Sequence, residues 1–183
     1  MAYRNGTYVA FDGNGEKNPA NSDFKYYSLL KGWKNSKNIE FTFNDSHEKT
    51  YSVRDDSLKQ TLRTRLRERM KNSKNMLLIL SNDTSWDRGE LNYEIELAVD
   101  EFNIPIIAVY PNFSCILDPA ALNKYWPKSL QERIDNKTAK CIHIPFKEKL
   151  IFSAISQFSI NDDTIDHPLA YYDKQVYINL GLI

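Results

Sequence analysis

The chain has 183 residues and a formal net charge of zero, which argues against a nucleic-acid-binding or membrane-surface protein. Its length suits one well-packed domain, and an aromatic content of 13% excludes a disordered chain. The two cysteines and three histidines show no metal-ligand or disulfide spacing, so we expect no bound metal. Neither a signal sequence nor a run of ~18 apolar residues occurs, so we expect a soluble, cytoplasmic protein.

The first predicted strand is a short apolar run at residues 8–11, which ends in the turn Asp12-Gly13-Asn14-Gly15. Glycine, asparagine and aspartate after a strand form tight turns whose backbone N–H groups can approach a phosphate. Because the turn lacks a complete phosphate-binding motif, a plain connection is the alternative interpretation.

Residues 21–23 offer good helix N-caps. The helix predicted after them carries an inward apolar stripe of Tyr26, Leu29, Leu30 and Trp33. The second predicted strand, residues 39–43, alternates with period two and ends in a polar cluster that contains Asp45 and His47. These two side chains could contact a ligand or form an ordinary Asx turn, and the sequence leaves both open.

The second predicted helix begins at Asp55 or Asp56 and has an apolar residue at every fourth position from Leu58 to Met70. Its other positions are strongly basic. A nucleic-acid surface is conceivable, but the neutrality of the whole chain favours a solvated face with scattered ion pairs.

The centre of the sequence is a strand–helix–strand unit, with apolar runs at residues 76–80 and 104–110 around a helical segment at residues 86–102. Strands that are apolar on both faces indicate a parallel sheet covered on both sides. In such sheets, ligands bind beyond the carboxyl ends of the strands, where the following helices begin.

Glu94 is the carboxylate of this helix that draws attention. At 3.6 residues per turn it lies at the margin of the apolar stripe, about one turn from the sheet edge, while Glu96 and Asp100 point away. The simplest interpretation is a boundary glutamate whose stem packs and whose carboxylate stays hydrated. The stripe itself comprises Leu91, Ile95, Ala98, Val99 and Phe102.

A short helix at residues 129–134, a fifth strand at 141–146 and a fifth helix at 147–158 complete the pattern. Five β/α units predict an α/β fold with a flavodoxin-like, doubly wound, five-stranded parallel sheet. We expect residues 1–160 to form this domain and the aromatic-rich residues 161–183 to form a C-terminal extension that packs on it.

Several short motifs occur in an order that resembles the TIR-like proteins typified by the TIR subunit of Thoeris anti-phage systems. The resemblance runs nearly from end to end. Its motifs are F-D-G at 11–13, Y-Y-S-L-L-K-G-W-K at 26–34, N-D-S-H at 44–47, L-R-E-R at 66–69, N-Y-E-I-E-L-A at 92–98, P-I-I-A-V at 105–109 and Y-Y-D-K-Q-V-Y-I-N-L-G-L at 171–182.

The resemblance implies a TIR-like enzyme that consumes NAD+ as a substrate and needs no cofactor. It also implies release of nicotinamide and formation of a cyclic or otherwise modified ADP-ribose, a diffusible signal for a partner effector. A phage-derived trigger and self-association into a homo-oligomer are further expectations, and no nucleic-acid or membrane partner is expected. Two alternatives are a non-enzymatic TIR-type scaffold and a deoxyribosyltransferase-like nucleoside enzyme.

The resemblance also assigns site residues. Glu94 matches the catalytic glutamate of a W-V-x-x-E-I-like motif, although Glu90 replaces the tryptophan expected four residues earlier and the nearest tryptophan is Trp86. We hypothesise that the Glu94 carboxylate stabilises the positive charge that develops on the ribose. The residues expected near the nucleotide are Phe11, Asp12, Asn14, Asp45 and His47.

Overall fold

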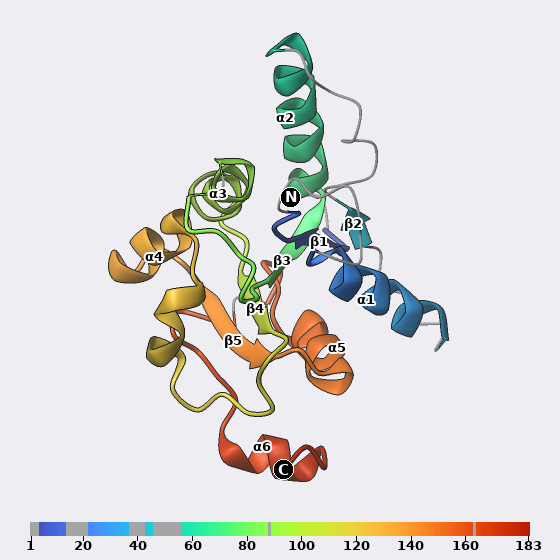
Figure 1. Ribbon diagram of the computed structural model, residues 1–183, viewed down its shortest axis with the longest axis vertical. Coiled ribbons are helices and arrows are strands. Elements are labelled where there is room, and N and C mark those ends of the chain that lie inside the picture. The colour runs from blue at the N-terminus through green and yellow to red at the C-terminus, as the bar shows by residue number, and fades with distance from the viewer. Residues whose placement is uncertain (1–3, 14–21, 37–42, 46–55, 88, 163) are drawn as a thin grey trace.

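The computed structural model describes residues 4–13, 22–36, 43–45, 56–87, 89–162 and 164–183, and is built on a parallel sheet (Figure 1). The strand order is β2-β1-β3-β4-β5, the order of flavodoxin-like sheets. Each pair of neighbouring strands runs parallel, which confirms the predicted parallel α/β class. The strands are β1 (Gly6–Ala10), β2 (Phe43–Asp45), β3 (Ser73–Ile79), β4 (Ile106–Tyr110) and β5 (Cys141–Pro145).

Helices cover both faces of the sheet (Figure 1). Helices α2 (Asp56–Lys71), α3 (Gly89–Glu96) and α4 (Lys128–Asp135) contribute to one apolar cluster, with alternate strand residues such as Met76 and Leu78. Helices α1 (Phe24–Ser36), α5 (Glu148–Gln157) and α6 (Lys174–Asn179) contribute to the other, with Leu77 and Ile79. Because successive side chains of a strand point to opposite faces, the fully apolar runs serve both clusters.

The central helix is shorter than the predicted segment at residues 86–102. It begins at Gly89 and continues as a π-helical turn, η2 (Leu97–Glu101), in which the Phe102 N–H donates to the Leu97 carbonyl at 3.0 Å. Its predicted inward positions from Leu91 to Val99 are buried. Trp86 lies before the helix and is 53% exposed, whereas Phe102 is half-buried at the helix end.

The predicted stripe of α1 is confirmed at Leu30 and at the partly buried Tyr26 and Trp33, and it is wrong at Leu29. The structure buries Tyr27 and Leu30, and it leaves Leu29 45% exposed. Tyr27 is turned inward because its ring stacks on Phe11 at the end of β1, at a centroid distance of 5.6 Å. Tyr26 and Trp33 pack on Phe146, so the inward face of α1 is wider than the predicted stripe and includes both adjacent tyrosines.

A buried chain of hydrogen bonds joins β4, β5 and two segments that the sequence pattern did not reveal. The Trp126 indole, just after the 3₁₀ helix η3 (Pro119–Tyr125), donates to the Tyr110 hydroxyl at 2.9 Å. That hydroxyl lies 2.7 Å from Nδ1 of His143, whose Nε2 lies 3.0 Å from the Pro168 carbonyl. A carbonyl only accepts, so Nε2 carries the proton, Nδ1 accepts, and each polar atom of the chain is paired. Burial lowers the pKa of His143 to about 4, so the ring is neutral.

The C-terminal segment pairs with the outer side of β5. The His143 N–H donates to the Ala170 carbonyl at 2.8 Å, and the Ala170 N–H donates to the Cys141 carbonyl at 3.0 Å. Further along, Tyr177 of α6 is fully buried and its hydroxyl donates to the Ile116 carbonyl at 3.2 Å. Among the described residues, we find no helix whose length and hydropathy would let it span a membrane.

Candidate active site

Glu94 is buried between α3 and the sheet. Only 5% of it is exposed, and the hydroxyl of Tyr8 donates to its Oε1 at 3.1 Å. Tyr8 is an interior residue of β1 and is fully buried. The simplest interpretation of the sequence leaves this carboxylate hydrated at the margin of the stripe, whereas the structure buries it against the sheet. A carboxylate withdrawn from water needs hydrogen-bond donors, and Tyr8 supplies one.

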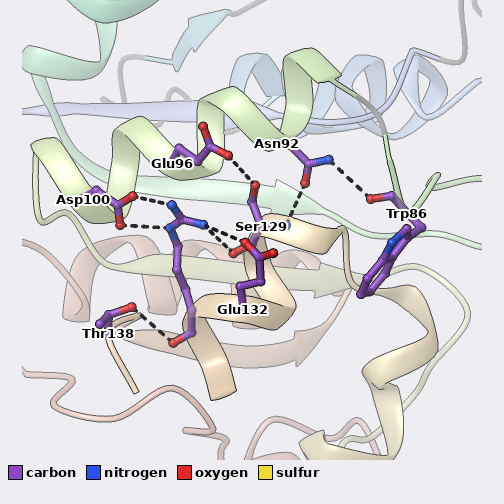
Figure 2. Close-up of polar contacts among 8 residues, drawn as sticks. Trp86, Asn92, Glu96, Asp100, Ser129, Glu132 and Thr138 are labelled. Atoms are coloured by element: carbon purple, nitrogen blue, oxygen red, sulfur yellow. Dashed lines mark hydrogen bonds and ion pairs between the residues drawn. The ribbon is translucent and has the colours of Figure 1, made fainter. Parts of the chain in front are cut away.

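Asn92 links α3 to the loop before it and to the start of α4 (Figure 2). Its side-chain oxygen accepts a hydrogen bond from the Ser129 N–H at 2.8 Å, and its side-chain nitrogen donates to the Trp86 carbonyl at 3.3 Å. The same carbonyl accepts from the Lys128 N–H at 2.9 Å. These contacts hold Asn92, two residues before Glu94 on α3, in place, and they therefore limit how far the Glu94 carboxylate can move.

Charged contacts continue along the outer faces of α3 and η2. Arg133 of α4 pairs with both carboxylate oxygens of Asp100. On the other side, Arg67 of α2 lies 2.6 Å from a carboxylate oxygen of Glu101. The guanidinium of Arg63 lies 4.3 Å from the centre of the Tyr93 ring. Some of the basic residues of α2 therefore contact neighbouring helices of the same chain.

Polar groups join the carboxyl ends of β1 and β3. Asp12, directly after β1, is 1% exposed, and its Oδ2 accepts from the Ser85 N–H at 3.0 Å. Asp23, before the first residue of α1, is fully buried, and its Oδ2 lies 3.5 Å from the Thr84 hydroxyl. Sequence reasoning gave Asp23 only a capping role, and it assigned no role to the residues after β3.

Burial raises the pKa of Asp23 to about 6, and the negative charges of Asp83 and Asp12 add to the rise. A hydrogen bond with Ser81 and the charge of Lys25 act in the opposite direction. A buried carboxyl group with a strongly raised pKa is more common in functional sites than elsewhere. Asp23 therefore joins Asp12 among the candidate functional groups at this edge of the sheet.

We expect Asp23→Asn to raise the free energy of unfolding at pH 7 by about 3 kcal/mol, which is the shift in the pKa of Asp23 converted to free energy. The folded-state pKa of Asp23 is raised, so between pH 3.8 and about 6 the unfolded chain loses this proton while the folded protein keeps it, and the cost of Asp23 to folding grows over this range. The gain should therefore be small at pH 4 and nearly complete at pH 7, as measured by chemical denaturation. Asp83→Asn, at an exposed neighbouring position, is the matched control and should change stability little. If Asp23→Asn were less stable than the parent at pH 7, the folded protein would stabilise the negative charge of Asp23, which contradicts the prediction.

The structure does not bring every predicted site residue together. Phe11 is 2% exposed and packs on the other face of the sheet from Glu94, where its ring lies 6.1 Å from that of Phe24. The backbone of Asp45 pairs with Val9 at the end of β2. Two further predicted residues, Asn14 and His47, lie outside the described residues.

Comparison with known proteins identifies the family. Residues 8–114, more than half of the chain, match the family described as Thoeris protein ThsB, TIR-like domain. The chain belongs to this family. The match confirms the resemblance inferred from the sequence motifs and associates the chain with Thoeris anti-phage defence. Glu94 and Asp12 lie inside the matched segment, whereas Ser129, which contacts Asn92, lies outside it.

Among solved structures, this member of the ThsB TIR-like family is similar to a conserved protein from Enterococcus faecalis V583. The two chains share 15% sequence identity, with a TM-score of 0.54, and the similarity covers 85% of this chain and 99% of that chain. At this identity the likeness shows the fold alone.

Proposed function

We propose that this chain is an NAD+-consuming enzyme of anti-phage defence. It cleaves the bond between nicotinamide and ribose and makes a cyclic or otherwise modified ADP-ribose. The observation that carries the proposal is the carboxylate of Glu94, which is buried on α3 and hydrogen-bonded to Tyr8 of β1. Membership of the ThsB TIR-like family supports it, since TIR-like domains often consume NAD+.

The proposed reaction needs a fixed negative charge more than it needs a proton donor. When the C1′–N bond of NAD+ breaks, its electron pair moves to the pyridinium nitrogen and nicotinamide leaves as a neutral molecule. Positive charge then develops on the ribose as an oxocarbenium ion, and the carboxylate of Glu94 stabilises it. The oxygen of water then bonds to C1′ and a proton is released, or a nucleophilic group of the same molecule bonds there and closes a ring.

The rest of the proposed site follows the strand ends. Backbone N–H groups of residues 12–14 hold the pyrophosphate, and the side chains of Asp45 and His47 orient the ribose or the acceptor nucleophile. Asp12, whose carboxylate already accepts from Ser85, sets the position of this turn. The protein uses NAD+ as its substrate and requires no separate cofactor.

The proposed cellular role has three further parts. A phage-derived trigger activates the enzyme in the cytoplasm, the product binds a partner effector as a diffusible signal, and self-association completes the active assembly. Family membership supports the link to defence.

The test is to incubate the protein with NAD+ and, separately, with a deoxynucleoside. Each reaction is run in lysate from uninfected and from phage-infected cells, and chromatography follows the released base. We expect nicotinamide from NAD+, with the larger amount in infected lysate. Release of the base from the deoxynucleoside alone would indicate a nucleoside-processing enzyme. Release of neither base in infected lysate would indicate a non-enzymatic scaffold and overturn the proposal.

A further inference from the structure

We propose that Tyr8 is a positioning residue for Glu94, whose hydroxyl sets the orientation of the carboxylate and keeps it ionised for the reaction. The inference rests on the proposed catalytic role of Glu94, but the contact behind it is a feature of the fold. Oε1 of Glu94 lies 3.1 Å from the Tyr8 hydroxyl, and both residues are buried.

The backbone holds Tyr8 in place on both sides. In the sheet it is paired with Met76 of β3 and with Asn44 of β2, so its ring projects from a fixed point beneath α3. The ring belongs to the apolar cluster that also contains Leu91 and Ile95 of that helix. Because the Tyr8 ring is packed in this way, its hydroxyl can move little, and it therefore fixes the direction in which the Glu94 carboxylate points.

The chemistry of the pair favours the ionised acid. A carboxylate surrounded by apolar side chains tends to take up a proton, because burial disfavours the charged form. A hydroxyl that donates to the carboxylate acts in the opposite direction, and this hydrogen bond is stronger in a poorly hydrated environment than in water. The Tyr8 hydroxyl therefore favours the charged form of the buried Glu94 carboxylate, which is the form that the oxocarbenium ion requires.

Packing alone would not select tyrosine at this position. A phenylalanine would present the same ring to Leu91 and Ile95 and would fill nearly the same volume. Tyrosine adds a hydroxyl group, and the structure places that group against the carboxylate assigned to the reaction.

Tyr8→Phe in the full chain tests the proposal. We expect kcat for nicotinamide release to fall by about tenfold to a hundredfold, which corresponds to the loss of one hydrogen bond to a charged group. KM for NAD+ should change little, and the acidic limb of the pH–rate profile should move to higher pH. If Tyr8 acted only on stability, Tyr8→Phe would change neither the acidic limb of the profile nor kcat under conditions in which the variant is fully folded.

Tyr177→Phe is the matched control. It removes another buried tyrosine hydroxyl, that of a ring in the cluster on the other face of the sheet, which donates to the Ile116 carbonyl. This variant should lose stability but retain the kcat and pH profile of the parent. An unchanged kcat and pH profile in Tyr8→Phe, or a change in KM alone, would overturn the inference.

A second measurement separates this inference from the proposed function. The carboxyl carbons of glutamate are labelled with ¹³C, and the Glu94 signal is assigned by its loss in Glu94→Gln. If Tyr8 holds the carboxylate, the titration midpoint of this signal moves to higher pH in Tyr8→Phe, whether or not the protein cleaves NAD+. An unmoved midpoint contradicts the role of Tyr8, whereas an inactive parent protein in infected lysate contradicts only the proposed function.

Discussion

Glu94→Gln is expected to lower nicotinamide release from NAD+ by roughly a hundredfold or more, the scale of losing one preorganised electrostatic group in an active site. Glutamine keeps the size of the side chain and an oxygen that can accept from Tyr8. It removes the negative charge, and with it the stabilisation of the oxocarbenium ion. Chromatography of nicotinamide at saturating NAD+ in infected lysate measures the effect.

Glu96→Gln is the control for this substitution. Glu96 lies two residues further along α3 and is exposed, and its carboxylate accepts from the Ser129 hydroxyl at 2.9 Å. Glutamine retains an acceptor for that bond, so activity should stay near that of the parent. Equal activity of the Glu94 variant and the parent would remove Glu94 from the mechanism.

Tyr110→Phe should lower the free energy of unfolding by about 4 kcal/mol, because it leaves the buried Trp126 indole N–H and His143 Nδ1 unpaired, and each costs about 1–3 kcal/mol. Burial raises the pKa of Tyr110, so its hydroxyl keeps the proton that it donates to His143. For a chain of this length, the loss corresponds to a Tm about 10 °C lower. Chemical denaturation and thermal melting measure it.

Tyr125→Phe provides the comparison for the Tyr110 variant. Its ring packs against that of Tyr110 at 6.1 Å, but we find no hydrogen bond of its hydroxyl within the described part of the chain. This variant should change the unfolding free energy by less than about 1 kcal/mol. If the two variants were equally stable, the hydrogen bonds of Tyr110 would contribute nothing net to folding.

The sequence predicts the centre of the fold well, because the strongest patterns are there. The strands on either side of α3 are apolar on both faces, and the buried positions from Leu91 to Val99 follow the helical period. The prediction was less complete in α1, where the apolar period did not include Tyr27, whose ring stacks on Phe11. It failed for η3 and α6, which are short and lack a regular apolar period.

The candidate site depends on tertiary contacts that sequence patterns do not predict. The position of Glu94 on its helix follows from periodicity, but its burial depends on Tyr8, which lies far away in the chain and becomes its neighbour only when the sheet forms. The same is true of Asp23, whose raised pKa depends on burial beneath the segment after β3 and on the charges of Asp83 and Asp12. Sequence patterns locate a side chain on its own element, whereas tertiary contacts determine its hydration.

The pairing of the C-terminal segment with β5 limits how copies of this protein can assemble. An uncovered edge strand invites another chain to extend the sheet. Here the backbone groups of Cys141 and His143 that face outward are already bonded to His167 and Ala170. Strand addition at β5 would first require this segment to detach. Any filament or ring built from the folded protein must therefore form through some other surface.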